Sequence, residues 1–283
     1  MKPLQNSLNV SVVICTKNVA DTIVECLLSI KNNNPKEIIL VDANSSDKTR
    51  DIAKPYVNKI LNDQGKGLGN ARNIGLKTAK GKYVAFVGPD NIMPKGSFKK
   101  MINYLNKYNC SIVSAITVLK DTSLYLGWAQ NIYRSKFTSG YKKVVGTPTL
   151  SKTAVLKKYK YDPVMKNSDD TDLCERMAKD GHKVAISDAV VFEKGHTTLK
   201  AVIERWTRYG RGDFLFYKKY SPKWPLKRKF LSFCHPFFTD FLTPIKILGF
   251  KSISIIPFLL LITLLRYFGW LKTLISFNQK RGF

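Results

Sequence analysis

Acidic residues are scarce in this chain, and several stand where an α/β protein could use them for chemistry. The stretch "VAFVGPDN" leaves a single carboxylate, Asp90, after a buried apolar run, and "NSDDTDLCERM" places Asp169, Asp170 and Asp172 at the start of a predicted helix. A carboxylate can help to hold a hard divalent cation or can accept a proton as a general base. The same residues are also common in turns and at helix N-termini for local reasons.

Asp42 is a further candidate, because it closes the apolar run "EIILVD". The following "ANSSDKT" supplies small polar groups and Asp47 at a predicted helix start, so capping of free amides is the structural alternative. His196 follows the strand-like "VVFEKG" and is one of three histidines. A single histidine of this kind is either a structural residue or a metal ligand.

Two motifs supply further candidate arginines. Arg72 and Asn73 lie in "NARNIG", on the first turns of a predicted helix. The motif "ERWTRYGRGDF" supplies Arg205, Arg208 and Arg211. Guanidinium groups match phosphate oxygens, so we interpret the second motif as a lid over a diphosphate or an acceptor phosphate. The alternative for Arg72 is a solvated helix face, and the alternative for the second motif is a basic amphipathic helix with a solvated face.

The elements that must position these residues alternate between strands and helices. Short β-branched runs predict strands buried on both faces, at residues 10–16, 37–42, 83–88 and 111–118. Longer amphipathic runs between them predict helices, at residues 22–31, 47–54, 68–79 and 96–108. This order predicts an α/β, Rossmann-like fold with a mainly parallel central sheet and helices on both faces.

Ligands of such sheets bind beyond the carboxyl ends of the strands. Candidate residues that follow the predicted strands are Thr16, Asn18, Asp42, Asn44 and Asp90. The glycine-rich "GKGLGNARNIG" does not follow a strand, as a dinucleotide fingerprint must, and lacks the ending of a nucleotide-hydrolase loop. We therefore expect neither a dinucleotide-dependent dehydrogenase nor a P-loop enzyme.

Four segments together resemble the family 2 glycosyltransferases with the GT-A fold. They are "VSVVICTKN", "IILVDANSSDKT", "GLGNARNIGLKTAKGKYVAFVGPDN" and "SDDTDLCERMAKDG", and the resemblance covers roughly residues 9 to 212. It implies a nucleotide-sugar donor, usually a divalent metal such as Mg²⁺ or Mn²⁺, and inversion of the anomeric carbon. We accordingly predict a GT-A catalytic domain at residues 1–215.

The resemblance also implies roles for individual residues. The residues expected to bind the donor are Thr16, Asn18, Asp42, Asn44, Arg72, Asn73 and Asp90. Asp42 matches the acid that binds the nucleotide base or ribose, and Arg72 matches an arginine near the donor diphosphate. Asp90 matches the metal-binding acid of an Asp-x-Asp pattern, whose first acid is replaced by Gly88 in this chain.

The remaining roles concern the reaction itself. By the resemblance, Asp170 matches the general base that deprotonates the acceptor hydroxyl. Asp169 stands beside it, where the family more often has Glu. His196 matches a histidine that returns to the metal in many relatives, so Asp90 and His196 are the expected metal ligands.

Composition points to polyanionic partners. Lys and Arg outnumber Asp and Glu by 47 to 20, which favours contact with nucleic acid, an anionic membrane face or phosphorylated substrates. No nucleic-acid-binding module is recognisable, so we expect no nucleic-acid partner. The five cysteines are scattered without ligand spacing, which predicts neither a disulfide framework nor a zinc site and fits a reducing cytoplasm.

Residues 216–283 are basic and strongly apolar, and we interpret them as a membrane-associated helical region. The uncharged run from Ser252 to Leu265 has 14 residues, fewer than the roughly 20 that span a bilayer. Extending it to Phe277 brings in Arg266 and Lys272. Spanning and monotopic arrangements both remain open, and a pair of core helices is the structural alternative. We expect the protein at the cytoplasmic face of the cell membrane.

Two classes of function are compatible with these observations. The first is a membrane-bound inverting glycosyltransferase that acts on the hydroxyl of a lipid-linked or membrane-presented acceptor, with membrane lipids among its partners. The second is a non-catalytic protein that binds polyanions or lipid on the same fold. Within the first class, a polyprenyl-phosphate sugar synthase is the nearest rival, but its anionic acceptor needs no strong base, so the Asp169 and Asp170 pair favours a hydroxyl acceptor.

Overall fold

The computed structural model describes residues 7–195 and 197–279, and the chain divides into two compact units. The first unit contains residues 1–118, 138–164 and 169–194, and the second contains residues 119–137, 165–168 and 195–283. The predicted domain boundary after residue 215 lies inside α8 (Leu199–Tyr220), a helix of the second unit.

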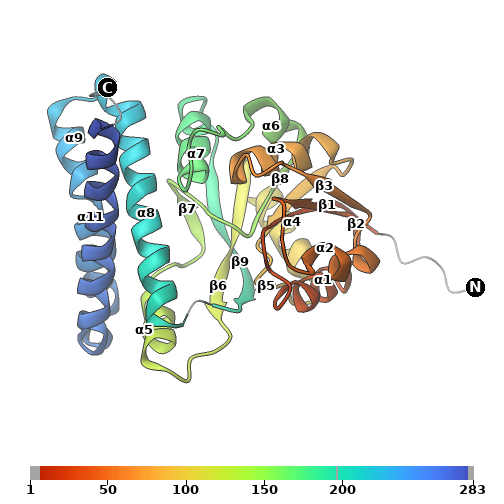
Figure 1. Ribbon diagram of the computed structural model, residues 1–283, viewed down its shortest axis with the longest axis horizontal. Helices are drawn as coiled ribbons and strands as arrows, with labels where there is room; N and C mark the ends of the chain where they lie inside the picture. The colour runs from red at the N-terminus through yellow and green to blue at the C-terminus, as the bar shows by residue number, and fades with distance from the viewer. Residues whose placement is uncertain (1–6, 196, 280–283) are drawn as a thin grey trace, which may run out of the picture. The chain divides into compact units, whose positions relative to one another are not determined.

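The first unit is built on one sheet, which has nine strands among the described residues. Its strands are β1 (Leu8–Thr16), β2 (Pro35–Asp42), β3 (Lys59–Asn62), β4 (Tyr83–Val87), β5 (Asn91–Ile92), β6 (Ile112–Leu119), β7 (Gly140–Lys142), β8 (Thr149–Lys152) and β9 (Val184–Glu193). The order along the sheet is β3-β2-β1-β4-β8-β6-β9-β5, and β7 pairs with β9 (Figure 1).

The two halves of the sheet differ in strand direction. Strand β1 pairs in parallel with β2 and β4, and β2 pairs in parallel with β3. Strand β8 then enters antiparallel to both β4 and β6, and β9 is antiparallel to β5 and β7. The predicted parallel α/β arrangement is therefore confirmed in the N-terminal half, and the other half makes the sheet mixed.

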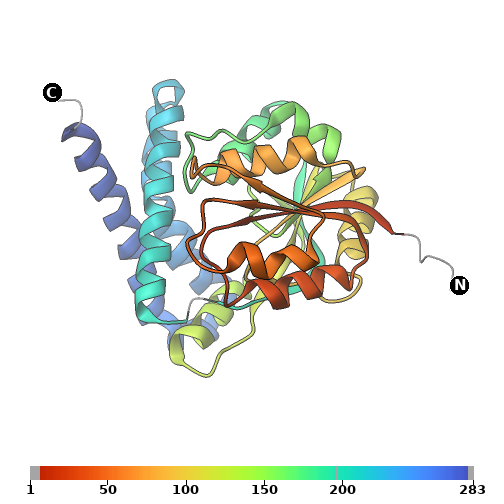
Figure 2. The ribbon, with the colours of Figure 1, turned by 45° about the vertical axis from the view of Figure 1, so that its right-hand side comes forward.

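Helices cover both faces of this sheet, as predicted (Figure 2). The helices of the first unit are α1 (Ile23–Lys31), α2 (Thr49–Ala53), the short η1 (Lys54–Tyr56), α3 (Leu68–Thr78), α4 (Ser97–Lys107), α6 (Thr153–Tyr159) and α7 (Asp169–Lys179). The four strands and four helices predicted from the sequence all form, with ends within two residues of the predicted ones.

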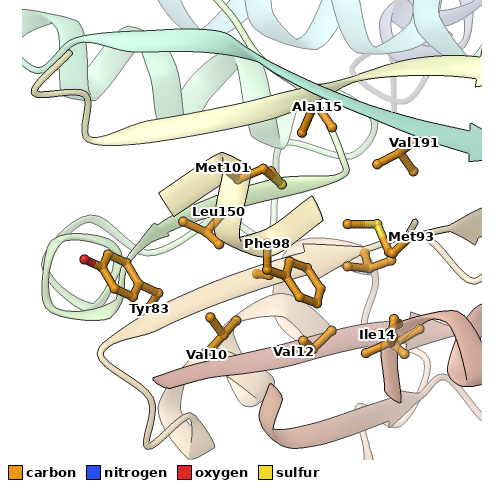
Figure 3. Packing of buried hydrophobic residues seen from close by; sticks show 14 of the residues in the cluster. Val10, Val12, Ile14, Tyr83, Met93, Phe98, Met101, Ala115, Leu150 and Val191 are labelled. Atoms are coloured by element: carbon orange, nitrogen blue, oxygen red, sulfur yellow. The ribbon is translucent and has the colours of Figure 1, made fainter. Parts of the chain in front are cut away.

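The core of the first unit follows from the alternation of side chains along each strand. Val10, Val12 and Ile14 of β1 point to one face and pack in a cluster with residues of α1, α2 and α4 (Figure 3). Val13, on the same strand, belongs instead to a cluster with α3, α6 and α7. Because both faces are buried, β1 reads as a continuous apolar run in the sequence.

The second unit is helical. Its elements are α5 (Tyr125–Arg134), α8 (Leu199–Tyr220), η2 (Ser221–Lys223), α9 (Leu226–Phe233), the π-helical η3 (Phe237–Leu242), α10 (Thr243–Leu248), the 3₁₀-helical η4 (Gly249–Ile255) and α11 (Ile256–Gln279). The residues from Phe237 to Gln279 form one helical stretch that is long and apolar enough to cross a membrane, by length and composition only.

Helices α8 and α11 lie side by side (Figures 1 and 2), and two glycines allow their backbones to approach closely. A Cβ atom added at Gly210 would lie 1.9 Å from the carbonyl oxygen of Arg266. One added at Gly269 would lie 2.0 Å from the carbonyl oxygen of Thr207. Neither position of this interface can therefore accept a side chain without separating the helices.

A buried ionic network crosses the same interface. Arg266 of α11 donates hydrogen bonds to Asp213 of α8 at 2.9 and 2.8 Å and to Asp240 of η3 at 2.6 Å. Asp240 also accepts a hydrogen bond of 2.5 Å from Tyr133 of α5. Around these groups, Trp206 and Phe258 belong to an apolar cluster of the unit. Four helical elements thus meet at Arg266 and its partners.

We predict that Gly269→Ala destabilises the second unit. The new methyl group must push against a backbone carbonyl, and overpacking of this kind costs about 1–3 kcal/mol or more. Urea unfolding followed by helical circular dichroism measures the effect. The matched control is Ser276→Ala on the exposed side of α11, which should change the free energy of unfolding by less than about 0.5 kcal/mol. Equal stability of the two variants would contradict the close contact.

Candidate active site

The centre of the candidate site is a buried arginine shared by two acids. Arg72 of α3 is 5% exposed and donates to Asp169 at 2.6 Å and to Asp170 at 2.8 Å, both from Nη1. Its Nη2 donates to the Thr147 hydroxyl at 2.7 Å. Asp169 and Asp170 begin α7, as predicted, so the first turns of α3 and α7 face each other through this cluster.

The two acids of the cluster differ in exposure. The Asp169 side chain is 6% exposed, whereas that of Asp170 is 25% exposed. Withdrawal from water is the main cause that raises the pKa of Asp170, to about 6. Arg72 opposes the rise and Asp169 adds to it. Asp170 is thus a partly accessible carboxyl that changes charge near neutral pH, which is the range in which a general base works best.

Tyr161 and Asn73 build the wall behind Arg72. The Arg72 guanidinium lies 4.9 Å from the centre of the Tyr161 ring, and that ring meets Phe86 of β4 edge to face at 5.3 Å. The Asn73 amide donates to the Tyr161 carbonyl and accepts from the Tyr161 backbone N–H, both at 2.8 Å. Asn73 therefore fixes this wall, and its predicted contact with a donor stays a prediction.

Asp42 organises the loops that follow β1 and β2. It is fully buried and accepts hydrogen bonds from the hydroxyls of Thr16 at 3.0 Å and Ser45 at 2.6 Å. The Ser45 backbone N–H donates to it as well, at 2.9 Å. The two strand ends named by the sequence analysis are thus held together by one carboxylate.

Two asparagines complete these loops in left-handed backbone conformations. Asn18 has a φ of 52° and accepts from the Ser46 backbone N–H at 2.8 Å, while its own N–H donates to the Ser45 hydroxyl. Asn44 has a φ of 55° and accepts from the Asn62 amide at 2.7 Å. Asparagine tolerates this conformation better than most residues. The loops therefore have a defined shape before any ligand is present.

Asp90 lies at the end of β4, as predicted. Its backbone carbonyl accepts from the N–H of Lys194 at 2.8 Å, which ties it to the end of β9. The Asn91 side chain accepts from the Gly88 N–H at 2.9 Å. A Cβ atom at Gly88 would lie 2.6 Å from Asp90 Oδ1, so the glycine makes room for the Asp90 carboxylate.

The side chains around Asp90 supply some, but not all, of the ligands that a hard divalent cation needs. In residues 7–195 and 197–279, no three His, Cys, Asp or Glu side chains form a group that could hold a metal alone. The Asp90 carboxylate is nevertheless an oxygen ligand of the kind that Mg²⁺ and Mn²⁺ prefer, and diphosphate oxygens commonly complete such sites. His196, the other expected ligand, lies outside the described residues.

The predicted lid arginines belong to the second unit. Arg205, Arg208 and Arg211 all lie on α8, and the last two are exposed. Arg205 donates to the Tyr209 hydroxyl at 3.0 Å on the same helix. Their role over a phosphate stays a prediction.

Sequence reasoning missed Thr147 and Tyr161, and it did not foresee that Arg72 binds Asp169 and Asp170. These partners lie 75 to 98 residues from Arg72 along the chain. No local pattern marks such contacts. One signal in the sequence could have suggested the contact. Acids are scarce in this chain but cluster at residues 169–172, and Arg72 stands in a motif with few other charges.

Comparison with known proteins gives one family. The model of "Glycosyl transferase family 2" matches residues 11–162. The minor teichoic acid biosynthesis protein GgaB of Bacillus subtilis is 33% identical over 112 residues, which cover 36% of this chain and 12% of that protein. The poly(ribitol-phosphate) beta-N-acetylglucosaminyltransferase TarS of Staphylococcus aureus is 32% identical over 113 residues, or 36% and 20% of the two chains. The matched segment thus spans a fifth or less of these two relatives.

A solved structure extends the comparison to the fold. The crystal structure of S. aureus TarS 1–349 in complex with UDP-GlcNAc superposes with a TM-score of 0.52 at 16% identity, covering 96% of this chain and 92% of that chain. At this identity the likeness concerns the fold alone. It confirms the predicted GT-A architecture.

We predict that Arg72→Met raises the pKa of Asp170 above its value of about 6, because the cation that favours the charged carboxylate is removed. Arg72→Lys should raise it less. Since only the ionised form accepts a proton, the range in which Asp170 can act as a base would then begin at higher pH. Carbon NMR titration of labelled aspartates measures the value, with Asp170→Asn identifying the signal.

The matched control for this titration is Arg50→Met, which removes an exposed arginine of α2. It should leave the Asp170 signal unchanged. An unchanged or lowered pKa in Arg72→Met would show that Arg72 does not set the charge of Asp170.

Proposed function

The chain belongs to glycosyl transferase family 2, and we propose that it transfers a sugar from a nucleotide-sugar donor to an acceptor hydroxyl with inversion of the anomeric carbon. The observation that carries this proposal is the cluster of Arg72, Asp169 and Asp170, where one partly exposed carboxyl has a pKa of about 6. A base of this kind serves a hydroxyl nucleophile, which must lose its proton as it attacks.

The donor we propose is a UDP-sugar, with UDP-GlcNAc as the first to test. The related TarS has been crystallised with UDP-GlcNAc, and this chain shares its fold. The loops held by Asp42, with Asn18 and Asn44, offer a preformed polar edge beyond the ends of β1 and β2. That edge is where ligands of α/β sheets bind.

The proposed transfer is a single displacement. The acceptor oxygen forms a bond to the anomeric carbon while the bond from that carbon to the diphosphate oxygen breaks on the opposite face. The electron pair of the broken bond leaves with the nucleoside diphosphate, and the acceptor proton passes to the Asp170 carboxylate. Arg72 holds Asp170 in place at 2.8 Å and favours its ionised form, while the same Nη1 also donates to the more deeply buried Asp169 at 2.6 Å.

Asp90 is the residue that would hold a divalent metal, with His196 as the proposed second ligand. A cation bound there supplies neutralisation of the charge that develops on the leaving diphosphate. The chain's own contribution is to keep the Asp90 carboxylate at the end of β4, over the space left by Gly88.

The acceptor we propose is lipid-linked or otherwise presented at a membrane, with the enzyme at the cytoplasmic face of the cell membrane. Two observations support this location. Residues 237–279 are apolar enough to associate with a bilayer, and the net charge of +27 favours anionic surfaces and phosphate-containing acceptors. The names of GgaB and TarS, which concern teichoic acid biosynthesis and poly(ribitol-phosphate), point to acceptors of this anionic kind.

We predict that Asp170→Asn lowers sugar transfer by about 10²–10⁴-fold, the usual contribution of a positioned general base. The substitution keeps the shape and the hydrogen bonding of the side chain, so the affinity for UDP-GlcNAc should stay close to that of the parent. Asp42→Ala should show the converse, a loss of donor affinity. Transfer is measured with radiolabelled donor, and affinity by calorimetry.

The outcome for Asp170→Asn separates two acceptors. Transfer at the parental rate would mean that the acceptor needs no deprotonation by this residue. A polyprenyl phosphate, already anionic, would then be the better acceptor to test.

We further predict that Asp90→Ala raises the Mn²⁺ concentration required for half-maximal turnover by about tenfold or more, since loss of supporting groups alone typically weakens metal sites by 10–100-fold. The matched control is Asp51→Ala, which removes an exposed acid of α2. Turnover of Asp90→Ala at the parental rate in excess chelator would exclude Asp90 as a metal ligand.

A further inference from the structure

The outer face of α11 is apolar along most of the helix. Its members recur every three or four residues, so they form one stripe, and each is 46 to 66% exposed. We call this the outer stripe: Leu260, Leu264, Phe268, Leu271 and Ile275. From Leu260 to Ile275 it runs for about 22 Å along the helix axis. Large apolar side chains in such a row are unusual on a surface that faces water.

The polarity of α11 is inverted relative to a surface helix of a water-soluble protein. Arg266, its single charged residue between Ile256 and Leu271, points into the unit and is 8% exposed. It is held there by Asp213 and Asp240. Thr263 also faces inward, at 6% exposure. Between Ile256 and Leu271, polar groups on the inner side and apolar groups on the outer side indicate an apolar environment outside.

The neighbouring helix α8 has the opposite character. Its exposed positions include charged residues at intervals of three or four, followed after eight residues by one more, all on one side of the helix: Lys200, Glu204, Arg208, Arg211 and Lys219. A row of this kind needs water or lipid headgroups, because charged side chains are expensive within the hydrocarbon of a bilayer. The helix pair therefore presents one surface suited to water and another suited to lipid.

The packing of α8 along α11 indicates whether α11 crosses a membrane or lies on its surface. Helix α11 follows α8 from the cluster around Trp206 and Phe258 to the contact of Phe214 with Phe277. In between, Gly210 and Gly269 bring the backbones together. If α11 crossed the bilayer, α8 would carry its charged row through the hydrocarbon as well. If α11 instead lies in the plane of the membrane, the charged row of α8 stays outside the hydrocarbon.

The chemistry around the outer stripe selects anionic lipid as its occupant. Between residues 222 and 279 the sequence has eight Lys and Arg but a single acid, Asp240, which is buried against Arg266. Helix α9 combines Lys227 and Arg228 with the exposed Leu226 and Phe230. Basic residues beside exposed aromatic and aliphatic side chains suit the headgroup region of an anionic leaflet.

We propose that the outer stripe of α11 embeds in one leaflet of an anionic membrane, with the helix lying in the membrane plane and Arg266 keeping it attached to α8. The proposal rests on the membrane location of the proposed function and makes it specific: the protein is monotopic, and α11 does not span. The partner is the lipid surface itself.

The test compares vesicle binding by the full chain and two double variants. Leu264→Gln with Phe268→Gln alters the outer stripe, and Lys200→Gln with Glu204→Gln alters the charged row of α8. Neither pair changes net charge, and all four positions are exposed. We expect the first pair to weaken co-sedimentation with vesicles of phosphatidylcholine and phosphatidylglycerol by about tenfold or more, and the second pair to leave it within about twofold.

Several outcomes would overturn the proposal. Equal vesicle binding by both pairs would show that the stripe is not the contact. Complete release of the parent protein by high salt would indicate a purely electrostatic contact. A stable dimer that Leu264→Gln with Phe268→Gln dissociates, without vesicle binding by the parent, would assign the stripe to a second copy of the chain. If that variant fails to fold, Leu260→Ser with Leu271→Ser on the same stripe replaces it.

Depth measurement separates an in-plane helix from a spanning one. Spin labels at Leu264→Cys and Ile275→Cys stand 11 residues apart, or about 16 Å along the axis. We expect both labels at similar depth in one leaflet, after subtraction of the signal from the labelled parent with its native cysteines. Depths that differ by most of this length would mean that α11 crosses the bilayer.

A last measurement distinguishes failure of this proposal from failure of the proposed function. Release of UDP from UDP-GlcNAc in detergent, without vesicles, should be the same for the parent and for Leu264→Gln with Phe268→Gln. Absence of release in the parent would count against sugar transfer from this donor and leave the lipid contact standing. Normal UDP release by the parent, together with vesicle binding that Leu264→Gln with Phe268→Gln leaves unchanged, would count against the lipid contact and leave the proposed sugar transfer standing.

Discussion

Arg72 is a cation withdrawn from water and held between two carboxylates, and the architecture of the candidate site depends on this arrangement. A buried charge without a partner is strongly destabilising, so the positions of α3, α7 and the chain before β8 are mutually constrained. One positive charge does not satisfy two acids completely. Burial raises the pKa of Asp170, the more exposed of the two, and the neighbouring Asp169 adds to this rise, so the charge of Asp170 is sensitive to pH.

The second unit also contains a buried arginine bound by two aspartates, and there the arrangement holds helices together. Arg266 also binds two aspartates, Asp213 and Asp240, but the surrounding contacts are apolar side chains and close helix backbones. Asp240 is 1% exposed and receives a further hydrogen bond from Tyr133. This cluster fixes the relative rotation of four helical elements. As a result α11 can present apolar residues outward while its charge stays inside.

The sequence predicted the first half of the fold well because buried parallel strands and amphipathic helices leave local patterns. The strand ends at Thr16, Asp42 and Asp90 could be found for that reason, and so could the start of α7. The antiparallel entry of β8 between β4 and β6 left no such pattern, since it depends on pairing across more than thirty residues. The partners of Arg72 were hidden for the same reason. The apolar C-terminal region was recognised from composition, but only packing against α8 distinguishes its inner from its outer face.

The distance along the chain between Arg72 and its acids has a consequence for how the protein is made. During synthesis, α3 emerges from the ribosome well before Asp169 and Asp170, which follow 97 and 98 residues later. Until then the guanidinium has no carboxylate to meet and α3 cannot settle against the sheet with its charge compensated. The nascent N-terminal half is therefore expected to pack less tightly around α3 until α7 has been made. A fragment cut at the end of the family match, residue 162, would lack both carboxylate partners of Arg72.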